Sequence, residues 1–303
     1  MSGVLDEAAA WELLRGIRSE AGAEAAGLRR GTAGGPLRWR AASPGAEALA
    51  DRYLPLCLAG AQVTFAQLGQ TLDGFIATRT GHADLVTGEE DRAHLHRLRA
   101  LSDAVVVGAG TAVADDPRLT VRACAGTNPV RVVLDPRGRV PAGRQVFTDG
   151  AAPTLWVVGE DAAPHTPRGD GVEVLTLRDS AGFAPHRLVR TLAERGLGRV
   201  LVEGGGVTVS RFLHERALRL LYVTVAPLLL GDGVPGLRFA GPELMRDAVR
   251  PRVRRAALGA DTLFELDLGT PSPGEPAGDE HDDAGQAGDE GQNAVDDGHG
   301  QSL

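Results

Sequence analysis

The strongest constraint on the fold of this chain is a change of hydrophobic pattern at Val63. From there, short apolar runs alternate with stretches of helical periodicity, and glycine-rich turns lie between them. This alternation is typical of α/β domains, in which helices cover a sheet. Two of the later apolar runs have no helical stretch between them, so we expect a mixed sheet. The expected strands are Val63–Leu68, Ala104–Gly108, Val130–Leu134, Thr154–Val158, Val172–Leu177, Arg199–Val202, Leu220–Ala226 and Thr262–Leu268, and the expected helices are Glu89–Ala100, Pro185–Arg195 and Thr208–Arg216.

The pattern predicts three regions along the chain. Residues 1–60 form a leader of uncertain role, in which apolar residues recur at helical spacing between Leu5 and Ile17. Residues 61–269 are expected to form one domain. Residues 270–303 carry nine acidic residues and no basic ones, with almost nothing to bury. Such a segment cannot offset its ordering entropy, so we expect an acidic disordered tail.

Composition narrows the classes of function. The net charge of −8 comes from this tail, because the rest of the chain has 32 basic and 31 acidic residues, or +1. A near-neutral body argues against broad nucleic-acid binding. All basic residues are arginines, which excludes a lysine acid or base. There is no apolar run of membrane-spanning length, no secretory signal, and no CxxC pair at Cys57 or Cys124. We therefore expect a cytoplasmic protein with reduced thiols, no membrane contact and no metal.

One glycine turn follows an apolar run at "VVVGAGTAVADDP". Gly108 and Gly110 match the first two glycines of the dinucleotide fingerprint G-x-G-x-x-G, but Val113 occupies the third position. Asp135, at the end of the next apolar run, lies near the place of a ribose-binding acid. A partial nucleotide fingerprint and a tight turn between strand and helix both remain open.

Two further stretches place acids beside glycines. In "RVLVEGGGVTVS", Glu203 ends an apolar run and three glycines precede a helix, where backbone N–H groups can approach a phosphate. In "QLGQTLDGFIA", Asp73 precedes a glycine. The structural alternative is a flexible turn for the first stretch and an Asp-Gly turn for the second. His94 and His96 lack the spacing of shared ligands, and zinc-hydrolase, zinc-deaminase, nucleophile-elbow and Walker motifs are absent.

The segments "TLDGFIAT", "ADDPRLTVR", "NPVRVVLDPRGRVP", "VLVEGGG" and "APLLLGDGVPG", in this order, resemble the pyrimidine reductase family of riboflavin biosynthesis. Members of that family occur alone or fused to a deaminase in RibD proteins. The resemblance covers about Val63 to Leu268. It implies a dihydrofolate-reductase-like α/β fold, with a mixed, mostly parallel sheet of about eight strands flanked by helices. It also implies a homodimer in which NADPH reduces a phosphoribosylamino-pyrimidine, converting its ribosyl side chain to a ribityl chain.

The resemblance also implies roles for particular residues. Cofactor contacts are expected at Gly69, Thr111, Asp115, Gly204, Gly205, Gly206 and Val207. Substrate contacts are expected at Arg99, Leu119, Arg122 and Glu203, with both arginines on the substrate phosphate and Glu203 at the opposite end. Asp73 lines the same cleft, so either Asp73 or Glu203 relays a proton. Arg137 and Arg139 follow Asp135, and Arg139 is expected to bind the 2′-phosphate that distinguishes NADPH from NADH.

The chain departs from the family pattern at three positions. Gln67 stands where many bacterial members have a lysine, and Ala83 and Leu85 replace a serine and a tryptophan of the fused enzymes. These changes motivate an alternative, a reductase of the same fold that acts on a pteridine or a natural-product intermediate. A non-catalytic nucleotide-binding protein is the other alternative, although four retained substrate-site residues argue against it. The deaminated and the undeaminated pyrimidine both remain candidate substrates.

Overall fold

The structure is a computed structural model that describes residues 3–31, 35–84, 86–162, 169–178 and 180–269. Two of the expectations above, the disordered tail and the role of Leu85, lie outside these residues. All described residues belong to one unit, Met1–Pro273. Among them, none of the helices is both long and apolar enough to cross a membrane.

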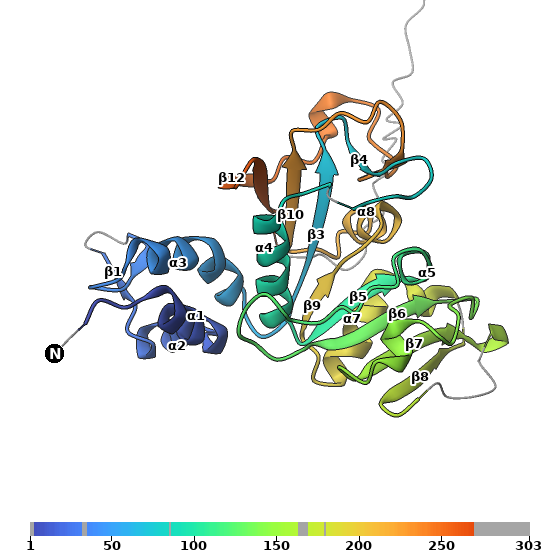
Figure 1. Cartoon of the computed structure of the whole chain (residues 1–303), viewed down its shortest axis with the longest axis horizontal. Helices are drawn as coiled ribbons and strands as arrows, with labels where there is room; N and C mark the ends of the chain where they lie inside the picture. Colours follow the sequence, from blue (N-terminus) through green and yellow to red (C-terminus); the bar gives the residue numbers. More distant parts are fainter. Residues whose placement is uncertain (1–2, 32–34, 85, 163–168, 179, 270–303) are drawn as a thin grey trace, which may run out of the picture. The chain divides into compact units, whose positions relative to one another are not determined.

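A nine-stranded sheet organises the described residues (Figure 1). Only β13 runs against the others, since it pairs antiparallel with both of its neighbours while every remaining pair is parallel. The expected mixed, mostly parallel sheet is therefore confirmed. In spatial order the strands are β12 (Arg252–Leu258), β13 (Asp261–Asp267), β10 (Leu220–Ala226), β3 (Val63–Thr71), β9 (Arg199–Val202), β5 (Ala104–Gly108), β6 (Val130–Asp135), β7 (Thr154–Gly159) and β8 (Val172–Leu177).

All eight expected strands are present in this sheet, and its ninth strand, β12, was not predicted from the sequence pattern. Its sequence "RVRRAAL" has only Leu258 buried. As an edge strand it pairs on one side only, with β13, and leaves its arginines in solvent. Such a strand needs neither an apolar run nor a regular alternation, so hydrophobic periodicity does not reveal it.

Helices cover both faces of the sheet. On one face lie α4 (Glu89–Ala100), α5 (Ala109–Ala114) and α6 (Gln145–Thr148), whose apolar side chains join a core cluster with Phe65, Val105 and Leu201. On the other face lie α7 (Pro185–Glu194) and α8 (Gly206–His214), which pack on Val106 and Val202. The three expected helices are thus present, and α8 begins two residues earlier than expected.

The start of α4 differs from the capping box that Thr87 and Glu90 suggest. Gly88 is the N-cap, with no side-chain cap bond. Its N–H donates to Asp261 Oδ2 at 2.6 Å, so a residue of β13 satisfies one free donor of this helix end.

Three helices precede the first strand of the sheet, namely α1 (Glu7–Gly16), α2 (Glu20–Ala25) and α3 (Pro44–Cys57). Asp6 and Ser43 cap α1 and α3 through their side-chain oxygens. The apolar faces of α1 and α3 meet and join the same core cluster as α4. In Figure 1, α4 lies between α3 and the strands β3 and β10.

The remaining elements are the pair β1 (Arg29–Arg30) and β2 (Leu37–Arg38), the pair β4 (Phe75–Ala77) and β11 (Val234–Pro235), and the 3-10 turns η1 (Glu160–Ala162), η2 (Ser180–Phe183) and η3 (Met245–Asp247).

Candidate active site

The three glycine-containing stretches singled out in the sequence meet at one edge of the sheet. The strands β3, β9 and β5 are adjacent and parallel, so their carboxyl ends lie together. The turn at Asp73 follows β3, the turn at Glu203 follows β9, and the turn at Gly108 follows β5. Ligands of open α/β sheets collect at this kind of edge.

The two glycine turns are joined by Thr111. Its Oγ1 accepts a hydrogen bond from Gly205 N at 2.8 Å. Gly204 has φ +96°, and a Cβ there would lie 2.6 Å from Thr111 Oγ1. A Cβ on Gly206 would clash with the carbonyl oxygen of Gly236. Glycine is therefore required for the close approach of these segments.

The amino end of α8 is open at this junction. Gly205 is its N-cap and has no side-chain cap bond, and Val207 is 85% exposed in the first turn. Free backbone N–H groups and the helix dipole favour an anion at this point. A group with phosphates fits this end, and the cofactor contacts that the resemblance implies at 204–207 fall on these residues.

The other implied cofactor contacts lie around the same edge. Gly69 belongs to β3, where a Cβ would lie 2.8 Å from Thr87 Cγ2. Asp115 ends α5 in an exposed position, and desolvation and the nearby charge of Asp84 raise its pKa. Arg139 is exposed in the segment after β6.

Asp135 holds the chain after β6. It is fully buried, and its carboxylate accepts Arg139 N at 2.9 Å, Val140 N at 2.8 Å and Trp156 Nε1 at 3.3 Å. These donors occupy both carboxylate oxygens. The residue therefore anchors a turn and is not exposed to a ribose, which removes the main support for a Rossmann-type fingerprint at Gly108.

A buried ion pair joins Arg99 to Glu203. Arg99 Nε and Nη2 donate to the two oxygens of Glu203 at 2.7 and 2.6 Å, and both side chains are less than a tenth exposed. Burial by itself lowers the pKa of Arg99, but the charge and hydrogen bonds of Glu203 reverse that effect and hold this pKa above its ordinary value. Arg99 Nη1 also donates to Thr120 O at 3.1 Å.

Arg99 and Glu203, which the resemblance assigns to opposite ends of the substrate, bind each other in the structure. Arg99 lies in the last turn of α4, and its long side chain reaches back along the helix to the end of β9. It therefore fixes the orientation of Glu203 and neutralises its charge.

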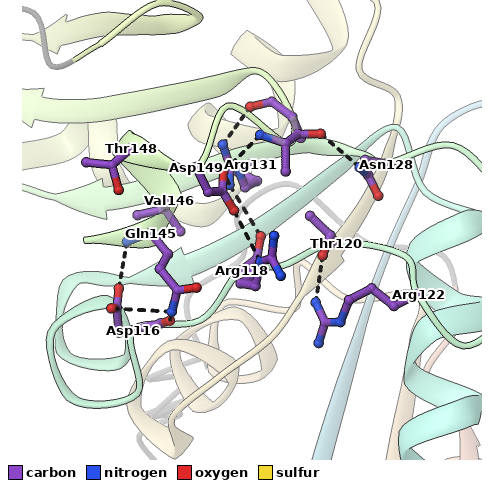
Figure 2. A network of polar contacts seen from close by, with 12 residues as sticks. Asp116, Arg118, Thr120, Arg122, Asn128, Arg131, Gln145, Val146, Thr148 and Asp149 are labelled. Carbon is purple, nitrogen blue, oxygen red and sulfur yellow. Dashed lines mark hydrogen bonds and ion pairs between the residues drawn. The ribbon is translucent and has the colours of Figure 1, made fainter. Parts of the chain in front are cut away.

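Arg122 keeps its guanidinium available. Its Nη1 donates to Thr120 Oγ1 at 2.6 Å, as Figure 2 shows, and among the described residues it has no carboxylate partner. Partial burial and the charges of Arg99 and Arg118 lower the pKa of Arg122, and the charge of Glu203 opposes them without reversing the shift. A bound dianion would relieve this repulsion.

His96 was not identified from the sequence. Its Nδ1 accepts the backbone N–H of Arg122 at 3.0 Å, which ties the segment after α5 to α4. Burial lowers the His96 pKa to about 4, and the charges of Arg99 and Arg122 act in the same direction. His96 is thus neutral at physiological pH, as its acceptor role requires.

The segment that carries Arg122 is strained and strongly anchored (Figure 2). Asp116 and Leu119 have φ of +43° and +55°, which is unfavourable for residues other than glycine. Asp116 Oδ1 accepts Gln145 N at 2.7 Å, and Gln145 Nε2 donates to Asp116 O at 2.9 Å. Leu119 as a whole residue is only 2% exposed, so little of its surface is accessible for the expected substrate contact.

Arg131, a fully buried residue of β6, supports this segment. Arg131 donates to Asp149 Oδ1, Ala152 O and Thr154 Oγ1 at 2.6, 2.6 and 2.9 Å. Figure 2 places Arg118 beside the same carboxylate. Arg131 stands in β6 at a position that hydrophobic patterning assigns to an apolar strand, so only the contacts reveal its role.

Asp73 is held by neighbouring donors. Thr71 Oγ1 donates to Oδ1 at 2.5 Å, and Leu230 N and Gly231 N donate to Oδ2 at 2.9 and 2.7 Å. The hydrogen bond from Thr71 and those from Gly231 and Leu230 lower the pKa of Asp73, although its partial desolvation opposes them. An anion held in this way joins the turn after β3 to the segment after β10, and it is a poor proton donor at neutral pH.

Gln67 and Asp91 form a second buried polar group that the sequence did not reveal. The Asp91 carboxyl accepts Thr224 Oγ1 at 2.6 Å and Gln67 Nε2 at 3.3 Å, and burial raises its pKa. A Cβ on Gly69 would lie 3.4 Å from Asp91 Oδ2. The position of Gln67, where the family often has lysine, is therefore next to a carboxyl at the edge of the candidate site.

A comparison with known proteins finds a matching family and similar relatives. The family described as "RibD C-terminal domain" matches residues 63–256. The chain is similar to a 2,5-diamino-6-ribosylamino-4(3H)-pyrimidinone 5′-phosphate reductase from Methanothermobacter thermautotrophicus, with 37% identity over 64% of this chain and 93% of the relative. It is also similar to the riboflavin biosynthesis protein RibD of Aquifex aeolicus, with 37% identity over 64% of this chain and 54% of the relative. It spans about half the length of that RibD protein.

Solved structures share the fold. A diaminohydroxyphosphoribosylaminopyrimidine deaminase/5-amino-6-(5-phosphoribosylamino)uracil reductase from Thermotoga maritima has a TM-score of 0.58 at 27% identity, over 68% of this chain and 56% of its own. Acinetobacter baumannii RibD has a TM-score of 0.60 at 26% identity, over 74% and 63%.

Proposed function

The chain belongs to the RibD C-terminal domain family, and from this premise we propose that it is an NADPH-dependent reductase of a phosphoribosylamino-pyrimidine. The substrate is 5-amino-6-(5-phosphoribosylamino)uracil or its 2,5-diamino analogue, and the product carries a ribityl chain. Two relatives at 37% identity are a reductase of the diamino compound and a RibD protein. The observation that carries the proposal is the buried Arg99–Glu203 pair beside Arg122, for which the described residues offer a hydroxyl partner, Thr120, and no ion pair.

The cofactor half of the site comes from the glycine turns. The open end of α8 at Gly204–Gly206 and Val207 would hold the cofactor phosphates, with Thr111 keeping the turn in place. Gly69 and Asp115 would contact the rest of the cofactor from β3 and α5. The cofactor, when bound, supplies the hydride. Arg139 would bind a 2′-phosphate, which supports NADPH over NADH.

The substrate half comes from α4, β9 and the segment after α5. Arg122 would bind the substrate phosphate. Glu203, held by Arg99, would accept hydrogen bonds from hydroxyl or amino groups of the sugar or pyrimidine through its remaining lone pairs. The sugar of the substrate would react in its ring-opened form, as an imine. These contacts would orient that imine so that C1′ of the sugar receives the hydride.

The reduction also needs a proton at the imine nitrogen. Asp73 is held as a carboxylate by Thr71, Leu230 and Gly231. Glu203 follows β9 and is likewise held as a carboxylate, because Arg99 donates to both of its oxygens. The proton would therefore come from solvent, with either carboxylate as the relay, and Asp73 would also position the turn after β3.

We also propose that the enzyme is a cytoplasmic homodimer. Leu228, Leu229 and Leu230 follow β10 and are 43%, 74% and 36% exposed. An exposed apolar run of this kind favours an interface. Sedimentation should give twice the chain mass at micromolar concentration, and a monomer there contradicts the dimer.

The test of the proposed function is NADPH oxidation, followed spectrophotometrically, with each of the two pyrimidine phosphates. Turnover is expected with at least one of them. Arg122→Ala should weaken binding of that pyrimidine about ten- to a hundredfold, because one charge-assisted contact is lost, and should leave NADPH binding unchanged. NADPH binding with no turnover of either pyrimidine would favour the pteridine or natural-product alternative. If Arg122→Ala weakens NADPH instead, the two halves of the site are assigned the wrong way round.

A further inference from the structure

The helices α1 to α3 lie outside the family match, yet they contact both segments that carry the substrate half of the site. The family match begins at residue 63. One of the contacted segments is α4, which carries His96 and Arg99. The other is the stretch of residues 119–128, here called the substrate loop, which carries Thr120 and Arg122 and contains neither helix nor strand.

Trp11 of α1 binds the substrate loop directly. Its indole Nε1 donates to Ala125 O at 2.7 Å, and the side chain is 4% exposed. Within the loop, Asn128 Oδ1 accepts Val121 N at 2.8 Å, one residue from Arg122. A Cβ on Gly126 would lie 2.5 Å from Ala100 Cβ, so the loop packs directly on the end of α4.

The same helices bind α4 on the side away from the site. Tyr53 of α3 hydrogen-bonds His94 Nδ1 at 2.8 Å. Arg97 pairs with Glu7 of α1 at 3.0 Å and lies 5.8 Å from the centre of the Trp11 ring. His94 and Arg97 therefore face the N-terminal helices, while His96 and Arg99 hold Arg122 and Glu203.

We propose that α1 to α3 are a buttress that fixes the substrate loop against α4, and that Trp11 is a positioning residue for Arg122. The loop needs such support because Asp116, shortly before it, and Leu119, its first residue, hold unfavourable φ values. Trp11 acts at a distance, through Ala125, and touches neither substrate nor cofactor. The kinetic part of this proposal rests on the proposed function, whereas its structural part does not.

The test compares two tryptophans that make the same kind of bond. Trp11→Phe removes the indole N–H and keeps an aromatic ring beside Arg97. Trp39→Phe is the matched control, because Trp39 Nε1 donates to Ala26 O at 2.9 Å within the N-terminal helices and the side chain is also buried. For each variant of the full chain we would measure hydrogen exchange of peptides covering 119–128, NADPH affinity, and kcat and KM for the pyrimidine.

We expect Trp11→Phe to speed exchange at the amides of Val121 and Arg122, and to raise the pyrimidine KM about three- to tenfold, as for the loss of one hydrogen bond. NADPH affinity should stay unchanged, and Trp39→Phe should alter neither exchange nor KM. Unchanged exchange in Trp11→Phe, or an equal change in both variants, overturns the proposal. If neither pyrimidine is turned over, the proposed function fails, and the exchange result alone decides whether Trp11 positions the loop. The two failures are therefore distinguishable.

Discussion

Removing Arg99 tests whether the Arg99–Glu203 pair is as buried as the structure shows. The two side chains are 8% and 6% exposed, and Arg99→Met leaves the Glu203 carboxylate without its cation. Breaking one partner of a buried pair costs about 3–5 kcal/mol, because the remaining charge stays desolvated. At 2–4 °C per kcal/mol for a domain of this size, the melting temperature should fall by roughly 6–20 °C.

An exposed ion pair provides the control. Arg195 pairs with Glu173 at 2.7 Å, with side chains 36% and 60% exposed. Arg195→Met should cost no more than about 1 kcal/mol, because solvent screens this pair. Both variants would be followed by thermal unfolding with circular dichroism, at the same protein concentration and salt.

A double variant separates stability from function. Arg99→Met with Glu203→Leu replaces both charges by apolar groups of similar size, which should recover most of the lost stability. The same variant should not bind the pyrimidine phosphate, because Glu203 is missing. If Arg99→Met costs no more than Arg195→Met, or if the double variant is as unstable as the single one, the reasoning about the buried pair is refuted.

Three further predictions concern pH, cofactor choice and the tail. Burial lowers the pKa of His94 to about 3, so as the pH falls below about 6.5 only the unfolded chain takes up a proton at this residue. The free energy of unfolding should therefore decline by up to about 1.4 kcal/mol per pH unit down to about pH 3. The variant His94→Phe should flatten that decline in urea titrations. Arg139→Ala should weaken NADPH binding and leave NADH binding unchanged in fluorescence titrations, and equal loss of both would reject the 2′-phosphate contact. Deleting residues 270–303 should leave the melting temperature and NADPH affinity nearly unchanged, and a drop of many degrees contradicts this.

The sequence by itself was sufficient to predict the alternation of strands and helices, and to single out the three glycine-containing stretches described above. Apolar runs and glycine turns report the alternation of strand and helix locally, so the eight expected strands and the parallel centre of the sheet followed from patterning and resemblance. The structure shows that β9 and β5 are parallel neighbours, so Glu203 and the glycines at 108 and 204 lie at one edge of the sheet. Strand β12 was missed because an edge strand has no need for the apolar run on which such patterning depends.

The tertiary structure decided which side chains act as partners. Arg99 and Glu203 are far apart in the chain, and only the packing of α4 against the sheet shows that they bind each other. The same holds for Asp91 with Gln67, and for Trp11 with Ala125. Periodicity records whether a residue is buried, because burial acts on each residue separately. The partner of a buried polar group depends on geometry between distant segments, and that information exists only in the folded chain.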